Sequence, residues 1–213
     1  IERARELAKR MIEIGIGFKR KVRAVLSNMD EPLGYSVGNA IEIIEAIETL
    51  KGNGAKDVKE VVYTIAAVAL KAKGVIKELK DGYRKIDEVI NSGLALSKLK
   101  EFIAESGGDE NLVNDYSILP VAKEKLEIFS QNNGYVAKIK AEEIGKAAMI
   151  IGAGRATKYD KIDHSVGIKI FKKVGDKVEK GEKLAEIYYN DEKNLRNSKE
   201  MLLDAYVLQN EKV

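Results

Sequence analysis

One loop combines residue types and a spacing that can hold a small ion. Residues 32–38 read Pro-Leu-Gly-Tyr-Ser-Val-Gly, and Asn39 follows as a typical helix N-cap with Glu42 placed as in a capping box. Glu45 lies one helical turn further along, so its carboxylate can face back toward the loop. A glycine-containing loop beside a helical carboxylate can cradle a cation or an anion. Local chemistry alone favours a plainer interpretation, a tight turn followed by a capped core helix.

Three other polar stretches are weaker candidates for a functional site. The basic cluster from Lys19 to Arg23 can hold a phosphate, but it reads better as the solvated end of a strand. Residues 152–155 (Gly-Ala-Gly-Arg) follow a predicted helix instead of opening one, so we interpret them as a helix stop and tight turn. Residues 160–165 place two acids beside His164, the only histidine. Side chains of consecutive residues diverge, so a solvated loop is favoured there over a Ser/His/Asp set.

Composition excludes several classes of function. The 213 residues include 37 basic and 34 acidic side chains, and this balance gives no electrostatic case for a nucleic-acid partner. The absence of cysteine excludes disulfides and thiolate sites, and a single histidine cannot support a multi-histidine zinc site. No apolar run is long enough for a transmembrane helix and no signal peptide is visible, so we expect a cytoplasmic protein without a membrane partner. The first residue is Ile1, not methionine, so the sequence can be a fragment.

Hydrophobic periodicity predicts a helix-rich first part and a mixed second part. In the first part we expect helices at 2–14, 39–50, 57–72, 83–92 and 94–105, and a strand at 19–26. The helix at 39–50 should be largely buried. In the second part we expect strands at 126–129, 135–139, 166–172, 183–189 and near 206–208, with helices at 141–151 and 191–204. We therefore predict an α+β or α/β fold with two domains, a partial central α/β domain (1–123) and a C-terminal α+β domain (124–213).

A hairpin in the second part has the pattern V-G-D-x-V-x-x-G-x-x-L over residues 174–184. It is similar to the turn regions of lipoyl and biotinyl carrier domains, which are barrel-sandwich hybrids. A carrier needs an exposed lysine beside methionines, whereas the nearest methionine here, Met149, lies on a predicted helix. The pattern therefore predicts barrel-sandwich-like hairpins and argues against a swinging-arm carrier.

Five segments together resemble the pyrimidine-nucleoside phosphorylase family. They occur in the family's order and span nearly all of residues 3–190: ELAKRMIEIG, VLSNMDEPLGYSVGNAIEIIEAI, INSGLALSKLKEFIAESGGD, GYVAKIKAEEIGKAAMIIGAGRATKYDKIDHSVGI and KVGDKVEKGEKLAEIY. The resemblance implies a homodimeric pentosyltransferase that converts a pyrimidine nucleoside and phosphate into the free base and (deoxy)ribose 1-phosphate. Domain closure would orient the two reactants and exclude water.

The resemblance also implies a potassium site and an incomplete active site. It assigns two backbone carbonyl ligands, at Leu33 and Ser36, and the carboxylate of Glu45, and hard cations favour such oxygen ligands. The family's phosphate loop and its pyrimidine-gripping residues precede the segment that corresponds to Ile1. We therefore assign no catalytic residue, and we expect this polypeptide alone to be inactive and its cation site to be weak.

Two alternatives remain, a non-catalytic binding or carrier-like module and a scaffold protein, each built on the C-terminal domain. For the fragment, we expect the strand at 22–26 to lack sheet neighbours. Exposed edges and apolar patches would then favour dimerisation or a rearranged first part. The second part, from about residue 124, should fold on its own.

Overall fold

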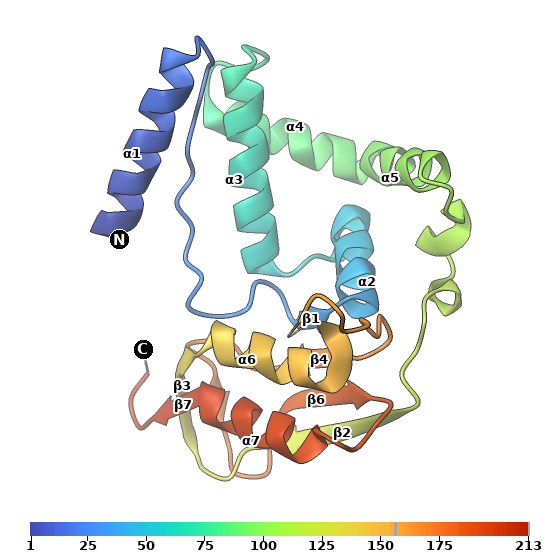
Figure 1. Cartoon of the computed structure of the whole chain (residues 1–213). Coiled ribbons are helices and arrows are strands. Elements are labelled where there is room, and N and C mark those ends of the chain that lie inside the picture. The colour runs from blue at the N-terminus through green and yellow to red at the C-terminus, as the bar shows by residue number, and fades with distance from the viewer. Residues whose placement is uncertain (156, 213) are drawn as a thin grey trace.

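A computed structural model describes residues 1–155 and 157–212 of the chain. Helices dominate the first part, and two small sheets with two helices form the second part (Figure 1). The long helices of the first part are α1 (Glu2–Gly17), α2 (Ala40–Glu48), α3 (Lys56–Ala72), α4 (Leu79–Asn91) and α5 (Leu94–Glu105). A helical turn at Thr49–Asn53 connects α2 to α3, and short turns at Glu110–Val113 and Tyr116–Ile118 connect α5 to the second part. The helices predicted for the first part are thus confirmed, with α4 beginning before its expected start.

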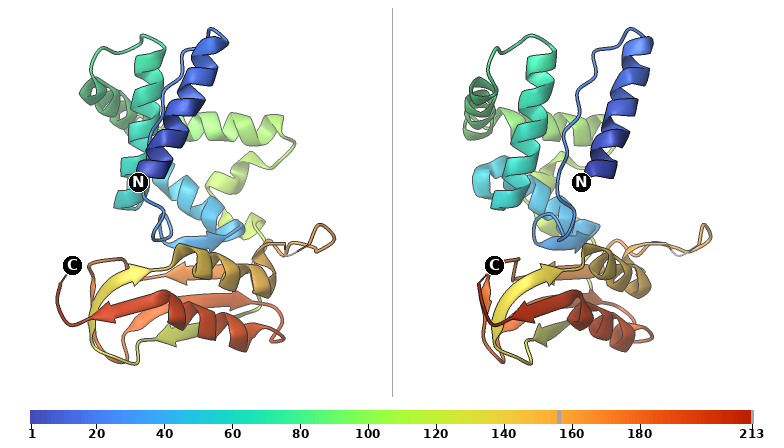
Figure 2. Two further views of the ribbon diagram at one scale, coloured as in Figure 1. Left: turned by 60° about the vertical axis from the view of Figure 1, so that its left-hand side comes forward. Right: turned by 90° about the vertical axis from the view of Figure 1, so that its left-hand side faces the viewer.

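The strand predicted at residues 19–26 is wrong. Helix α1 continues through Gly15 and ends at Gly17, and residues 18–35 form no helix or strand. Figures 1 and 2 show this segment running beside α3 toward the sheet. A strand needs a neighbour to accept and donate its backbone hydrogen bonds. None is available to residues 19–26 within the described chain, so the backbone there stays irregular and exposed.

Two antiparallel sheets make up the second part. The first has the strand order β1-β4-β6-β2, from Ser36–Gly38, Gly167–Ile170, Lys183–Tyr189 and Glu124–Phe129. The second has the order β5-β3-β7, from Lys177–Val178, Gly134–Ile139 and Tyr206–Gln209. Helices α6 (Ala141–Ala148) and α7 (Leu195–Ala205) complete this part, and a helical turn over Met149–Ala153 extends α6. The predicted strands and helices from residue 124 onward are confirmed, and so is the α+β character.

The main hydrophobic core lies within this second part. Its fully buried side chains come from both sheets and from α6 and α7, and include Ile128, Val136, Ile139, Ile144, Ile168, Ile187 and Leu202. In β4, Ile168 and Ile170 point into this core and Lys169 between them is exposed, which is the pattern of a sheet with one buried face, whereas residues 184–187 of β6 are all buried. The first part contributes few fully buried apolar residues. Independent folding of residues 124–213 stays a prediction.

Strand β1 belongs to the first part of the sequence but pairs with β4 of the second. Val37 lies opposite Ile168 and Gly38 opposite Gly167. A Cβ atom on Gly167 would lie 2.8 Å from the carbonyl oxygen of Val37, so the close approach of the two backbones requires glycine there. The first sheet therefore joins the segment that carries the candidate ion site to the C-terminal core.

Helix α2 departs from expectation in burial and in capping. Ile47 is buried, but Ile43 is 47% exposed, so the prediction of a largely buried helix is wrong for the face that turns away from the sheet. The Asn39 side chain donates to the carbonyl of Ala153 (2.8 Å) and makes no cap bond. Glu42 accepts from the amide of Gly38 (2.8 Å) instead of Asn39. The predicted capping box is thus replaced by two separate contacts.

Candidate cation loop

The carboxylate of Glu45 binds the backbone of the loop that precedes its own helix. Its two oxygens accept hydrogen bonds from the amides of Tyr35 (2.8 Å) and Ser36 (3.0 Å). Gly34 has a φ of +72°, and a Cβ atom there would lie 2.7 Å from either carboxylate oxygen. Glycine is therefore required for both the backbone conformation and the approach of Glu45. The sequence-based expectation that Glu45 faces the loop is confirmed.

The carbonyl of Ser36 faces the same side as Glu45. Ser36 lies opposite Lys169, and the carbonyl of Tyr35 accepts from the amide of Ile170 (2.8 Å). This pattern puts Ser36 in a non-hydrogen-bonded pair at the outer edge of the sheet, so its own N–H and C=O point away from β4. Its N–H donates to Glu45, and its C=O points outward from the same edge of the strand. The structure thus brings Ser36 and Glu45 together, with Leu33 in the same loop.

This donor set fits a monovalent hard cation. Backbone carbonyls and one carboxylate supply oxygen ligands with a single formal charge. Among residues 1–155 and 157–212, no cluster of three or more His, Asp or Glu side chains is arranged to hold a metal ion. A cation here would therefore depend on backbone oxygens beside Glu45.

A cavity of about 700 Å³ opens beside Glu45. Its walls come from α2, the outer face of the first sheet and the connection at residues 116–122, and most of them are apolar. The connection is tied to α2 because Tyr116 donates to Glu48, and Lys51 donates to the Tyr116 hydroxyl (2.8 Å). Hydrogen bonds from Tyr116 and Asn53 lower the pKa of Glu48 to about 2. The cavity therefore has one wall that is fixed by hydrogen bonds, and Tyr35 and Ser36 of the candidate cation loop, with Glu45, form another part of its lining.

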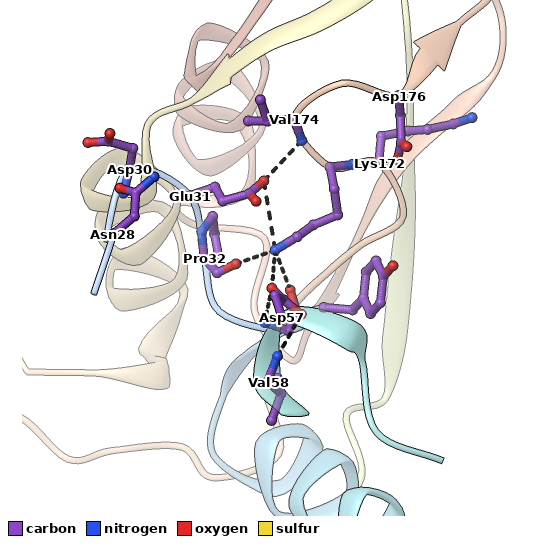
Figure 3. Close-up of polar contacts among 12 residues, drawn as sticks. Asn28, Asp30, Glu31, Pro32, Asp57, Val58, Lys172, Val174 and Asp176 are labelled. Carbon is purple, nitrogen blue, oxygen red and sulfur yellow. Dashed lines mark hydrogen bonds and ion pairs between the residues drawn. The ribbon is translucent and has the colours of Figure 1, made fainter. Parts of the chain in front are cut away.

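The same loop also binds the ammonium group of a lysine side chain from the second part of the chain. Lys173, from the turn that follows β4, donates to the carbonyls of Pro32 and Gly34 and contacts Asp57 (2.9 Å). Figure 3 shows Glu31, Pro32 and Asp57 converging on one lysine ammonium. Burial raises the pKa of Asp57, but hydrogen bonds from Lys173 and from the Gly34 amide outweigh this and lower it. Sequence reasoning missed Lys173, because its partners Pro32 and Gly34 lie 141 and 139 positions away in the chain.

The stretch around His164 is a structural turn. Asp163 accepts from the amide (3.0 Å) and the hydroxyl (2.6 Å) of Ser165 and from Asn190 (2.6 Å), and the carbonyl of His164 accepts from the amide of Ala40 (3.1 Å). Ser165 thus bonds Asp163 directly, without an imidazole between them. The interpretation as a loop instead of a catalytic triad is confirmed, but Ser165 is buried, so the expectation of a solvated loop is wrong at that residue.

Two candidate stretches remain, and neither forms a ligand site among the described residues. Gly152 has a φ of +110° at the end of the helical turn after α6, so the predicted helix stop is confirmed. The basic cluster from Lys19 to Arg23 lies in the irregular segment after α1 and is solvated, as favoured, although not as a strand.

Glu186, on β6, is a buried carboxylate that sequence reasoning also missed. It is 5% exposed, and it bonds Lys183 (2.8 Å) and the hydroxyl of Tyr188 (2.7 Å) and lies 3.4 Å from Lys125. Burial raises its pKa, but the bonds from Lys183 and Tyr188 outweigh burial and lower the pKa to about 2. The signal was the one acidic residue within the otherwise mainly apolar strand at 183–189. These partners satisfy the carboxylate, so we assign Glu186 a structural role.

Comparison with known proteins shows what the chain is similar to. Residues 135–209 match the model of the pyrimidine nucleoside phosphorylase C-terminal domain. The chain is 47% identical over 191 residues to the pyrimidine-nucleoside phosphorylase of Bacillus subtilis (strain 168), covering 90% of this chain and 44% of that protein. It is 43% identical over 189 residues to the pyrimidine-nucleoside phosphorylase of Geobacillus stearothermophilus, covering 89% of this chain and 44% of that protein. The chain thus spans less than half the length of these relatives. Its residues correspond to the C-terminal portion of the pyrimidine-nucleoside phosphorylases to which it is similar.

Proposed function

We propose that this chain works as the C-terminal portion of a pyrimidine-nucleoside phosphorylase. The activity would be pentosyl transfer from a pyrimidine nucleoside to phosphate, with release of the free base and a (deoxy)ribose 1-phosphate. The observation that carries the proposal is the 47% identity to a protein of that name across 90% of this chain. Part of the same proposal is a homodimer in the cytoplasm. No helix of the described residues is long and apolar enough to cross a membrane.

The role proposed for the loop at residues 32–38 is to hold potassium. The carbonyls of Leu33 and Ser36 and the carboxylate of Glu45 would bind the ion. When bound, the ion would supply positive charge near a phosphate-binding segment. Glu45 has a second task that needs no ion, because it fixes the amides of Tyr35 and Ser36 and so sets the direction of the Ser36 carbonyl.

We further propose that the polypeptide is inactive alone. The assigned residues cover one side of the cation, and the phosphate- and base-binding segments would have to come from sequence that matches the remaining part of the relatives. The open cavity beside Glu45 is the place where such a segment can reach the ion. The division into residues 1–123 and 124–213, and a barrel-sandwich arrangement of the two small sheets, belong to the same proposal. The alternatives of a carrier-like module or a scaffold have no contact in the structure that favours them.

Complementation tests this proposal. The chain would be incubated with uridine and phosphate, alone and mixed with a purified polypeptide that covers the N-terminal remainder of the Bacillus subtilis relative. We expect no phosphorolysis from either polypeptide alone and measurable uracil release from the mixture. The matched control is the same mixture made with Glu45→Gln, in which we expect uracil release to be reduced. Turnover by the chain alone at the rate of an intact enzyme would overturn the proposal of inactivity.

A further inference from the structure

The turn after β4 reaches across to the candidate cation loop. Its residue Lys173 lies in the second part of the chain, and its side chain is only 11% exposed. The ammonium donates to the carbonyls of Pro32 and Gly34 (3.0 Å to Gly34) and forms an ion pair with Asp57 at 2.9 Å. Glu31 adds a second carboxylate at 3.8 Å (Figure 3). One side chain therefore ties the loop and the start of α3 to the C-terminal core.

The turn is rigid enough to place this ammonium. The carboxylate of Asp176 accepts from the amide of Lys173 (2.8 Å), and Gly175 takes a φ of +92°, which favours glycine. The backbone of Val136 in β3 bonds the turn twice, to the amide of Gly175 (2.8 Å) and the carbonyl of Asp176 (2.9 Å). The amide of Val174 donates to Glu31 (3.0 Å). The ammonium thus projects from a turn that is fixed to the buried core and docked on the loop.

The oxygens around Lys173 form the kind of set that a monovalent cation takes. Two carbonyls and two carboxylates point their negative ends at one position, and they would repel one another without a positive charge between them. The ring of Tyr35 lies 5.8 Å from the ammonium, within range of a cation–π contact. The ammonium therefore serves as a resident cation that the chain itself supplies.

Neighbouring bonds link this position to the candidate potassium ligands. Gly34 donates its amide to Asp57 (3.0 Å) and accepts from Lys173 at its carbonyl (3.0 Å). The next two amides, of Tyr35 and Ser36, are held by Glu45. Leu33 and Ser36 flank these contacts, so a shift of Gly34 would change where their carbonyls point.

We propose that Lys173 is a positioning residue of the cation loop. Its ammonium fills one cation position and holds Pro32 and Gly34, so that the carbonyls of Leu33 and Ser36 can meet potassium beside Glu45. The coupling to potassium rests on the proposed function. The contact between Lys173 and the loop rests on the structure alone.

The test compares Lys173→Met with Lys172→Met. Lys172 is the matched control because it is the adjacent lysine, but its ammonium bonds Glu182 and the carbonyl of Lys177 (3.2 Å), both within its own hairpin. Amide hydrogen exchange would be measured for Gly34, Tyr35 and Ser36, in potassium chloride and in choline chloride of equal ionic strength. In Lys173→Met we expect protection of these amides to fall roughly tenfold or more, as for the loss of a charged hydrogen-bond partner. Lys172→Met should leave them unchanged.

Potassium dependence separates the two proposals. The cation site of this chain alone is expected to be weak, so potassium dependence is measured in the mixture with the N-terminal polypeptide. There, protection of the same amides should rise with potassium, and with Lys173→Met the required potassium concentration should increase several-fold. Absence of any potassium effect in the mixture would overturn the cation site, whereas the exchange comparison on the chain alone would still decide the role of Lys173. Unchanged loop protection in a folded Lys173→Met would overturn the positioning role. If Lys173→Met does not fold, Lys173→Gln replaces it, with the same loss at Tyr35 and Ser36 expected and unchanged protection refuting the role.

Discussion

The contact between Glu45 and the loop gives a direct test of how the candidate site is held. Glutamine in place of Glu45 keeps the length of the side chain but turns one acceptor oxygen into an NH2 group. The amides of Tyr35 and Ser36 each use a different oxygen of the carboxylate, at 2.8 and 3.0 Å. After Glu45→Gln only one of them can keep its acceptor, and the other faces a second donor.

The size of the effect follows from these two bonds. A hydrogen bond to an ionised group contributes about 1.5–3 kcal/mol, and the carboxylate here is only half-buried, so we expect Glu45→Gln to destabilise the loop by about 1–2 kcal/mol. That loss corresponds to roughly a five- to thirtyfold increase in the local opening of the loop. Glu42→Gln is the matched control, because Glu42 accepts a single bond, from the amide of Gly38 at 2.8 Å. An amide oxygen can accept that one bond, so little change is expected.

Amide hydrogen exchange and urea unfolding would measure the two variants side by side. Glu45→Gln should lose protection at Tyr35 or Ser36, while the amides of Ile168 and Ile187 in the core keep theirs. Equal behaviour of Glu45→Gln and Glu42→Gln at the loop amides would refute the reasoning, because it would mean that the second acceptor oxygen of Glu45 has no energetic role.

Three further predictions concern glycine conformation, core packing and pH. Gly34→Ala should lower the urea midpoint more than Gly52→Ala: both glycines have positive φ, but only at Gly34 does an added Cβ meet the carboxylate of Glu45, whereas at Gly52 it meets nothing within 4 Å. Equal losses would contradict the close approach of Glu45. Ile144→Ala, at a site with 0% exposure, should cost about 2–5 kcal/mol in urea unfolding, whereas Ile43→Ala, at 47% exposure, should cost less than about 1 kcal/mol. A small loss at Ile144 would show that α6 is not packed on the core. The pKa of Glu186 is lowered to about 2 in the folded chain, so its contribution to stability is present above its ordinary pKa and is lost as the pH falls from about 5 toward 2. Glu186→Gln should flatten the acid side of a urea-midpoint profile, and an unchanged slope would count against the assigned bonds.

Local patterns predicted the elements of this fold well, and they failed where an element depends on a distant partner. The helix α3 and the split between α4 and α5 at Gly93, which has a φ of +76°, follow from periodicity and from glycine punctuation. The strand predicted at residues 19–26 has a suitable alternation of side chains. Its backbone nevertheless finds no neighbouring strand, and alternation carries no information about whether one is present.

In the candidate site too, the local contact was predictable from the sequence and the long-range contact was not. The contact between Glu45 and its loop could be predicted from the sequence, because Glu45 lies in the helix that directly follows the loop. Lys173 could not, because it reaches Pro32 across 141 positions of the chain. In the sequence Lys173 is one of two adjacent lysines before a glycine turn, and nothing local distinguishes it from Lys172. Only the pairing of β1 with β4, which brings the turn beside the loop, gives the two lysines different roles.

Burial in the first part shows what an amphipathic pattern does and does not determine. Leu7, Met11 and Ile14 recur at helical spacing on α1, and this spacing correctly predicted a helix. The same side chains are 60%, 61% and 62% exposed, because no other described element packs on them. In the second part, Ile144 of α6 follows the same rule of spacing and is fully buried between the sheets and α7. Periodicity therefore indicates which face of a helix favours burial, and the surface that covers this face must be supplied from elsewhere.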